Sequence, residues 1–556
     1  MTFLFRNKGN VIIKPRKLIP LIKAVGRLTF IVLFPFPIYC QAWDAYFPLQ
    51  GPGSESIRIF EPISSNRIFI GGVYDDHFSP GGENLPLNGS KELFFGEWDA
   101  NGQNTWIAAA GSPDIETLDA AVVRADGTYI LGGRFFDSIQ FGAGSITSDL
   151  GSDAIFLACT DSEGELCWSF AIQGTAYKAL GGIQETETGD LLVVGAFNGF
   201  LYFEDVPTLS SGSGTNCFVA RFTANGLFVE ATQFESSLDS GLEELLITDD
   251  GQMYLAGYFN DTLYIGTDKL VAETQDQDLF ITKFNPESFT PVWSRHLGAQ
   301  YDDQLAGISW YEDKLYIGGS FLGVLNFKTG TLDDITTPGF NNNGFLASLS
   351  SEGVPLSLAG FGGLQDENVS CFNFSSGKPL WAGYYTGDPS LVGQNLPTAA
   401  GFSFYGFAGS WKDTTWPWAV SLTTDDQAFI EQIASDELGQ VWVSGFYKSN
   451  VFFDGVEETS GGFSDAFFGR LNPLFTPVSE VINPESIILY PNPTSAWLYL
   501  DSCCPLEEIR IIDQWGRNCS IQVKGQTINL EDLPDGVYYI QIKTQGALQW
   551  HRIIKH

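Results

Sequence analysis

The histidines are the first residues to examine for catalysis, because a nucleophilic serine or cysteine needs a base within reach. The chain has four of them, His77, His296, His551 and His556. His77 and His296 lie in different copies of the repeat described below, and other residue types fill the strand position of His296 elsewhere. The sequence also has no Cys-x-x-Cys, His-Glu-x-x-His or Gly-Lys-Ser/Thr phosphate loop. We therefore predict no catalytic residue and a structural role for His296.

Acidic clusters occur at DQD (276–278), YDD (301–303) and TTDD (423–426). Carboxylates of this kind bind Ca²⁺ through oxygen ligands, but none of the clusters has an EF-hand spacing. Since all of them fall at repeated turn positions, we predict turn-forming and strand-capping roles and no cofactor, with Ca²⁺ binding as the alternative. Hydrolysis of a polysaccharide would need two opposed carboxylates. With 66 acidic residues, the sequence nominates no such pair.

The densest aromatic patch is GSWKDTTWPWAV, which contains Trp411, Trp416 and Trp418. Trp418 falls where the repeat has its tryptophan strand, so we expect it in the core. Trp411 and Trp416 are candidates for an exposed contact with a carbohydrate or a protein, and buried packing is the alternative.

Two cysteines flank a short turn in CTDSEGELC, Cys159 and Cys167. If residues 162–164 form a three-residue hairpin loop with Gly164 left-handed, the two cysteines face each other at a distance that suits a disulfide. Two separate buried thiols are the alternative.

The elements that carry these residues recur at a fixed spacing. Seven copies of a turn and a strand that ends in Gly-aromatic have their last shared glycines 61 to 64 residues apart, at Gly72, Gly133, Gly195, Gly257, Gly319, Gly383 and Gly445. A second strand follows, often headed by Asp-x-Phe, and a third is often headed by tryptophan. These alternating apolar runs are separated by Asp-Gly, Asn-Gly and Ser-Gly turns, and no helical period is sustained. An all-β fold of seven repeats with about four strands each predicts a seven-bladed β-propeller over residues 43–477.

The phase of the repeat predicts a closed ring. The first copy begins with the tryptophan strand WDAYFPLQG, whereas the last copy ends after its Asp-x-Phe strand, SDAFFGRLNP. Residues 43–48 should therefore pair with the strand around residues 465–471, which hides both sheet edges. An open solenoid is the alternative.

The repeat resembles the SBBP-type propeller repeats, from which the sixth copy, with FSFYGFAGSW, departs most.

A second domain begins near residue 478, where the acidic bias ends. Short apolar runs separated by turns predict a small Ig-like β-sandwich over residues 478–556. This segment resembles the type A C-terminal sorting domain of the type IX secretion system. The resemblance is carried by four motifs, which supply the sorting-signal residues Tyr490, Pro491, Asn492, Pro493, Asp513, Gly516, Leu533, Gly536, Tyr538 and Lys555. It implies recognition by the type IX translocon, export across the outer membrane, and a cargo that is released or attached to the cell surface.

The amino terminus predicts a signal peptide over residues 1–42, with cleavage between Ala42 and Trp43. Seven basic residues and no acid precede the apolar stretch LTFIVLFPFPIYC. Removing them changes the net charge from −37 to about −44. Such a surface repels nucleic acid and anionic membranes. We expect no transmembrane segment in the mature chain.

These observations favour a secreted or surface-displayed propeller that acts as a non-catalytic binding or adhesion module for an extracellular glycan or protein. The alternative is a secreted polysaccharide-active enzyme with acidic residues on the propeller face. Under either hypothesis, variable loops such as SPGGENLPLNGSKE and TTPGFNNNG would supply specificity.

Overall fold

The computed structural model describes residues 42–472, except 83, 149–151, 204–206, 273, 376, 393, 395 and 413, and 488–555, except 491–493, 495, 502–505, 514–517, 520–521, 525–526, 532, 535 and 545–547. Every regular element among these residues is a β-strand. The predicted signal peptide up to residue 41 lies outside them. The predicted all-β class is confirmed.

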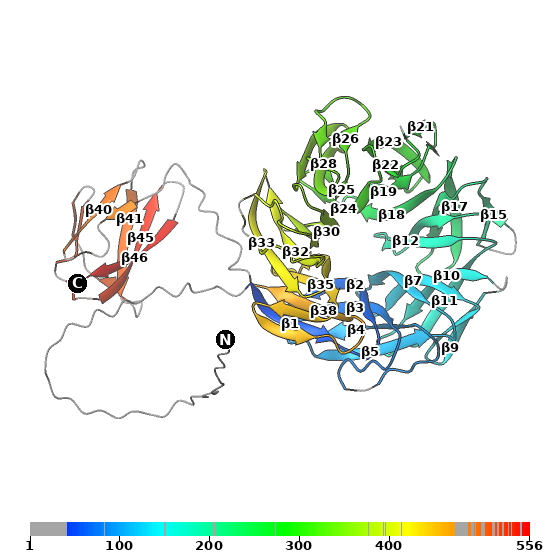
Figure 1. Ribbon diagram of the computed structural model, residues 1–556, viewed down its shortest axis with the longest axis horizontal. Helices are drawn as coiled ribbons and strands as arrows, with labels where there is room; N and C mark the ends of the chain where they lie inside the picture. Colours follow the sequence, from blue (N-terminus) through cyan, green and yellow to red (C-terminus); the bar gives the residue numbers. More distant parts are fainter. Residues whose placement is uncertain are drawn as a thin grey trace, which may run out of the picture. The chain divides into compact units, whose positions relative to one another are not determined.

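Residues 43–471 form a seven-bladed β-propeller, as predicted (Figure 1). Each blade is an antiparallel sheet of four strands, ordered from the centre outward. Blades 1 to 4 consist of β2 (Glu55–Ser64), β3 (Arg67–Tyr74), β4 (Glu92–Trp98) and β5 (Asn104–Gly111); β6 (Thr117–Val123), β7 (Tyr129–Phe136), β10 (Asp153–Thr160) and β11 (Leu166–Gly174); β12 (Lys178–Glu185), β13 (Leu191–Phe197), β16 (Asn216–Phe222) and β17 (Phe228–Ser236); and β18 (Ser240–Ile247), β19 (Met253–Phe259), β22 (Asp278–Asn285) and β23 (Thr290–Gly298). Blades 5 to 7 consist of β24 (Gln304–Tyr311), β25 (Lys314–Phe321), β28 (Asn343–Ser350) and β29 (Pro355–Phe361); β30 (Glu367–Ser375), β31 (Lys378–Tyr385), β32 (Tyr405–Lys412) and β33 (Thr415–Thr424); and β34 (Ala428–Ser435), β35 (Val441–Tyr447), β38 (Asp465–Leu471) and β1 (Trp43–Leu49).

The repeated glycine lies where the backbone of the first strand and a phenylalanine of the third strand both crowd the second strand. Gly72 pairs with Phe94, and Gly195 pairs with Phe218. A Cβ added at Gly72 would lie 2.1 Å from the Ser56 carbonyl oxygen and 2.7 Å from the Phe94 ring. Only glycine leaves room for the ring to cross the neighbouring strand, which explains why Gly and Phe recur with the same period.

Five blades carry an outer hairpin that the repeat pattern did not predict. Between the second and third strands of one blade, the chain crosses to the previous blade and extends its outer strand. These hairpins are β8 (Ser138–Phe141) with β9 (Gly144–Thr147), β14 (Phe200–Tyr202) with β15 (Pro207–Ser210), β20 (Thr262–Ile265) with β21 (Asp268–Val271), β26 (Val324–Phe327) with β27 (Ile335–Thr336), and β36 (Asn450–Phe453) with β37 (Val456–Thr459). Each hairpin ties two blades together. Their backbone bonds also cover sheet edges that would otherwise be open.

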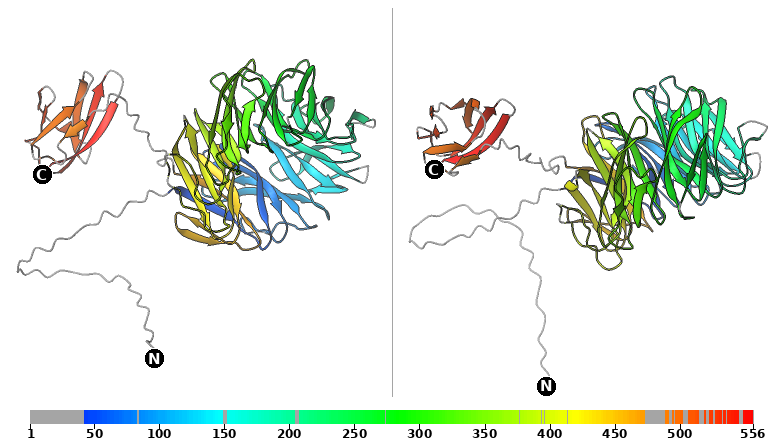
Figure 2. Two further views of the ribbon diagram at one scale, coloured as in Figure 1. Left: turned by 45° about the horizontal axis from the view of Figure 1, so that its top comes forward. Right: turned by 90° about the horizontal axis from the view of Figure 1, so that it is seen from above.

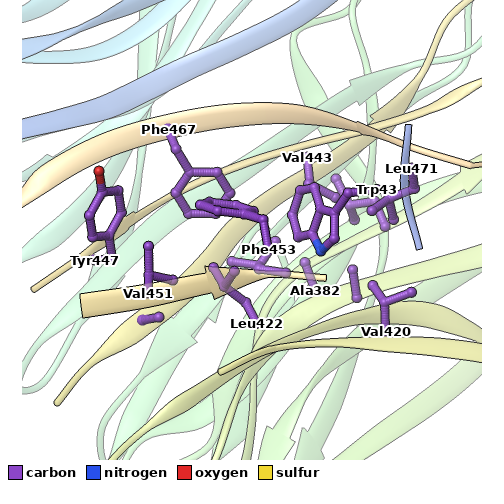
Figure 3. Close-up of a cluster of buried hydrophobic side chains, with 14 of the residues drawn as sticks. Trp43, Ala382, Val420, Leu422, Val443, Tyr447, Val451, Phe453, Phe467 and Leu471 are labelled. Carbon is purple, nitrogen blue, oxygen red and sulfur yellow. The ribbon is translucent and has the colours of Figure 1, made fainter. Parts of the chain in front are cut away.

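The first strand closes the ring, as predicted. β1 pairs with β38 from Trp43 opposite Leu471 to Leu49 opposite Ala466. The Trp43 ring is 4% exposed and lies 4.9 Å from the Phe453 ring in a T-shaped contact, among the buried side chains of blades 6 and 7 (Figure 3). The further views in Figure 2 show the same ring of blades from the side.

The C-terminal domain contains two four-stranded sheets. One is ordered β39 (Ile488–Tyr490), β40 (Trp497–Asp501), β44 (Thr527–Asn529) and β43 (Gln522–Lys524); the other is ordered β42 (Asn518–Cys519), β41 (Leu506–Asp513), β45 (Gly536–Thr544) and β46 (Leu548–Lys555). Leu498 and Ile528 of the first sheet share one core with Ile511 and Ile540 of the second. The Ig-like topology of this sandwich stays a prediction.

Candidate functional site

The seven innermost strands share a β-bulge with one extra residue. Each bulge follows the second or third pair of the strand, as between Leu242 and Glu244 on β18. The bulged residues are Arg58, Asp119, Gly181, Glu243, Ala306, Ser370 and Glu431. A bulged residue has no partner in the ladder, and the bulge re-aims its side chain. Asp119, Glu243 and Ser370 are exposed, while the residue before each of them on the strand is buried.

Carboxyl groups at and beside the bulges hold their protons more tightly than free carboxyl groups do. Burial raises the pKa of Glu243 to about 7, and burial together with Glu243 raises the pKa of Glu244 to about 7. Burial also raises the pKa of Glu431, which the neighbouring Arg58 partly offsets. These side chains reach water, yet the ring of blades surrounds them, and this incomplete solvation disfavours the charged form.

A pocket of about 720 Å³ opens where the innermost strands of blades 1 to 4 end. Its lining includes the acidic residues Glu61, Glu185, Glu187 and Asp249. Glu185 is held by Arg124 at 2.8 Å, and the pKa of Glu61 is raised by burial without a contribution from another carboxylate. Carboxylates are therefore present at the mouth of the ring, but Glu61 and Glu185 do not form the coupled acid pair that a glycosidase uses.

Pairs of carboxyl groups are buried at three seams between blades. In each pair, a residue three positions before the bulge meets the start of the third strand of the preceding blade: Glu55 with Asp465, Glu116 with Glu92, and Asp303 with Asp278. Burial, then Asp465 and Asp75, raises the pKa of Glu55 to about 8. Burial and Glu92 raise the pKa of Glu116 to about 7, although Ser112 donates a hydrogen bond that opposes the shift. At the seam between blades 2 and 3, Lys178 replaces one acid and lies 2.8 Å from Asp153.

These pairs predict that the propeller is most stable in acid. A carboxyl group whose folded pKa is raised contributes stability that is complete below its unfolded value near 4.5 and is lost as the pH rises through about 7 to 8. We expect the melting temperature to fall between pH 5 and pH 8.5, and the double variant Glu55→Gln, Glu116→Gln to flatten this slope. The exposed Glu163→Gln is the control for lost surface charge. An equal slope in the double variant and the control would contradict the prediction.

Large apolar side chains are exposed at the end of the blades where one blade passes to the next. Five successive inter-blade loops each carry one, and three loops before a third strand add a phenylalanine: Ile115, Tyr177, Leu238, Tyr301, Leu364, Phe340, Phe402 and Phe463. Phe340 is 84% exposed and Phe402 is 98% exposed. We call these eight residues the loop face. An exposed apolar surface of this kind is a candidate contact surface.

His296 and two of the acidic clusters lie together at the seam of blades 4 and 5. The Nε2 atom of His296 is 2.6 Å from Asp278 Oδ2, and both side chains are buried. Asp302 accepts a hydrogen bond from the Gln277 amide, and Asp303 accepts one from the Ala299 amide. These contacts fit the turn and capping roles that we predicted. The described residues contain no group of three or more His, Cys, Asp or Glu suited to a metal ion, and Ca²⁺ binding stays a prediction.

The three tryptophans of the aromatic patch are all buried. Trp418 is 4% exposed, as expected for the core, and Trp411 and Trp416 are each 2% exposed. The hypothesis of an exposed contact at Trp411 and Trp416 is therefore wrong, because both rings pack against Phe361, at 5.0 Å and 4.9 Å.

The hairpin of Cys159 and Cys167 has a different register from the one we expected. Gly164 is left-handed as predicted, with a φ of 80°. Cys167, however, lies in a bulge, so that Cys159 pairs with Trp168 instead. The thiols are free in the structure, and burial followed by the contact with Cys167 raises the pKa of Cys159 to about 12. The disulfide stays a prediction.

Those residues predicted for sorting that the structure describes lie on the strands of the C-terminal domain or directly beside them. Tyr490 ends β39 and Asp513 ends β41, where it pairs with Tyr538. The Tyr538 hydroxyl donates to the Pro534 carbonyl at 2.6 Å, and Lys555 ends β46. Leu533 packs against the core of the domain. Pro491, Asn492, Pro493 and Gly516 fall outside the described residues, and the sorting role of each residue stays a prediction.

Comparison with known proteins identifies the C-terminal domain. The family model of the secretion system C-terminal sorting domain matches residues 488–556. No curated protein matches the chain. In the part of the chain that the structure describes, no helix has the length and apolar character to cross a membrane.

Proposed function

Because the chain ends in a type IX secretion sorting domain and is therefore exported to the cell surface or the medium, we propose that its propeller is a non-catalytic binding or adhesion module. The observation that carries this proposal is the loop face. Its eight apolar side chains come from loops of all seven blades, and each is at least 36% exposed. In an exported protein, burial of such groups by a partner stabilises the complex by about 25 cal/mol per Å² of apolar area.

The partner that we expect is an extracellular glycan or protein. The net charge of −37 disfavours anionic partners such as nucleic acid. The loops of this face, including residues 79–92 and 336–344, differ in length and sequence from blade to blade and suit a specific contact.

The proposal predicts that binding depends on the loop face. The purified full-length chain is applied to arrays of immobilised extracellular glycans and proteins. The triple variant Ile115→Ser, Phe402→Ser, Phe463→Ser should weaken capture by at least about tenfold, because hot spots of this size dominate interfaces. Leu227→Ser with Leu438→Ser is the matched control, since these side chains are 67% and 75% exposed at turns on the opposite end of the blades.

Three results would argue against the proposal. They are the absence of binding to every array, an equal loss in the triple variant and in the control, and cleavage of a glycan. Cleavage would favour the alternative of a polysaccharide-active enzyme that uses the carboxylates at the mouth of the ring.

A further inference from the structure

A pocket of about 450 Å³ lies between blades 5 and 6, at the end of the blades opposite the loop face. Its lining combines the aromatic residues Tyr311, Tyr316 and Phe374 with the serines Ser348 and Ser357 and the oppositely charged Glu312 and Lys314. Pockets of this size with apolar walls and a few polar groups are typical of small-ligand sites.

In blade 5, serines occupy two register positions at this pocket that hold a lysine and a tryptophan in blade 4. In blade 4, Tyr254, Lys283 and Trp293 face one another across three neighbouring strands. The Trp293 ring lies 6.1 Å from the Tyr254 ring, and the Lys283 ammonium lies 5.7 Å from the Tyr254 ring. The matching row in blade 5 is Tyr316, Ser348 and Ser357. The tyrosine is kept, while the groups that cover it in blade 4 are replaced by two hydroxyls.

The turn of the next blade that packs against this row of side chains also differs. In blade 4, both Lys283 and Trp293 donate to the Ser351 carbonyl of the next blade, and a Cβ added at Gly353 would lie 2.6 Å from the Trp293 ring. In blade 6 the corresponding turn is shorter, and it holds Thr414 in a left-handed conformation with a φ of 73°. Such strain is uncommon outside glycine. The row of side chains in blade 5 and the turn of blade 6 that faces it both differ from their counterparts in blades 4 and 5, and this leaves the groove open.

The surface that this opens has aromatic faces beside hydroxyl groups. The Phe374 ring lies 4.5 Å from Tyr316 and stacks on Tyr311 at 4.9 Å. The Ser348 and Ser357 hydroxyls are 2.6 Å apart, and Ser357 is exposed to solvent. A sugar ring has the same two characters, because its axial C–H groups form an apolar face and its equatorial hydroxyls point outward. The net charge of −37 disfavours an acidic sugar.

We propose that this pocket is a carbohydrate subsite that takes one ring of a neutral glycan. The ring packs against the half-buried Tyr316 and Phe374 side chains, and its hydroxyls exchange hydrogen bonds with the exposed Ser357, which is itself bonded to Ser348. The site is separate from the loop face, so each is tested without reference to the other.

The test uses the full-length chain and four neutral probes, cellohexaose, laminarihexaose, xylohexaose and mannohexaose, in titration calorimetry. At least one probe should bind. The Ser357→Trp variant should weaken its affinity by at least about tenfold, because the indole ring fills the pocket. This variant should fold, since tryptophan occupies the same register position in blades 1, 2, 4 and 6, as Trp106, Trp168, Trp293 and Trp418. Tyr316→Leu is a second variant that keeps an apolar side chain but removes the aromatic face, and it should also weaken binding.

Glu230→Trp is the matched control, because Glu230 holds this register position in blade 3. It should leave affinity for the probe unchanged. The proposal is overturned if no probe binds, or if binding survives Ser357→Trp in a protein with an unchanged melting temperature. It is equally overturned if a tyrosine-containing peptide binds in place of the sugars and Ser357→Trp displaces it. The loop-face triple variant should bind the probe normally, which separates this site from the proposed adhesion surface.

Discussion

Deletion of residues 478–556 is expected to abolish export while leaving a folded propeller. The translocon reads the sorting domain, so that the truncated chain should stay in the periplasm, with no detectable amount in the medium or on the cell surface. Folding should persist because the ring closes through β1 and β38, both of which precede the deletion. Fractionation with immunoblotting measures the first effect, and a cooperative thermal transition of the truncated chain measures the second.

The matched control for this deletion is the same tail fused to an unrelated soluble domain, which should be exported. A truncated chain that still reached the medium would show that the address lies elsewhere. A truncated chain that failed to fold would show that the tail contributes to the propeller.

Trp43→Ala is expected to destabilise the propeller by about 3 to 5 kcal/mol, which is the usual cost of removing a buried tryptophan. The ring of Trp43 fills the space among Val443, Phe453 and Leu471 at the point where the two ends of the ring meet (Figure 3). The loss should appear in urea unfolding as a lower midpoint. Weakened closure also frees the edge of β38, so we expect more aggregation near the midpoint.

Asp44→Ala is the control on the same strand. Its carboxylate lies 2.6 Å from Arg470, but the pair is partly exposed, and such surface pairs contribute about 0 to 1 kcal/mol. A Trp43→Ala protein as stable as the Asp44→Ala protein would show that β1 does not hold the ring closed.

The repeat made most of the fold predictable. Gly72 and its six counterparts report a backbone contact that no other residue permits, and the phase of the repeat places Trp43 on the last blade. Trp418 was predictable for the same reason, because a repeated position has a repeated environment. The outer hairpins were not predicted, since they lie in the variable part of each copy and bond to the preceding blade.

The candidate sites depended on contacts between copies. A signal for the seam pairs was present in the sequence, because Glu55, Glu116 and Asp303 occupy one repeated position, but only the structure shows which acid each one meets. For Trp411 and Trp416 the sequence left an exposed contact and buried packing as alternatives, because Trp418 takes the repeated core position. Packing against Phe361 of blade 5 buries them.

The sequence by itself determined the all-β class, the number of blades, the closure of the ring and the secretion address, because periodic glycines, strand phase and a compact tail motif are local properties of the chain. The tertiary structure alone decided what lies between the blades. Whether Ser357 leaves a pocket, and whether Asp465 raises the pKa of Glu55, depends on side chains from different repeats. Those side chains meet only when the sheets pack face to face, at distances that no single repeat encodes.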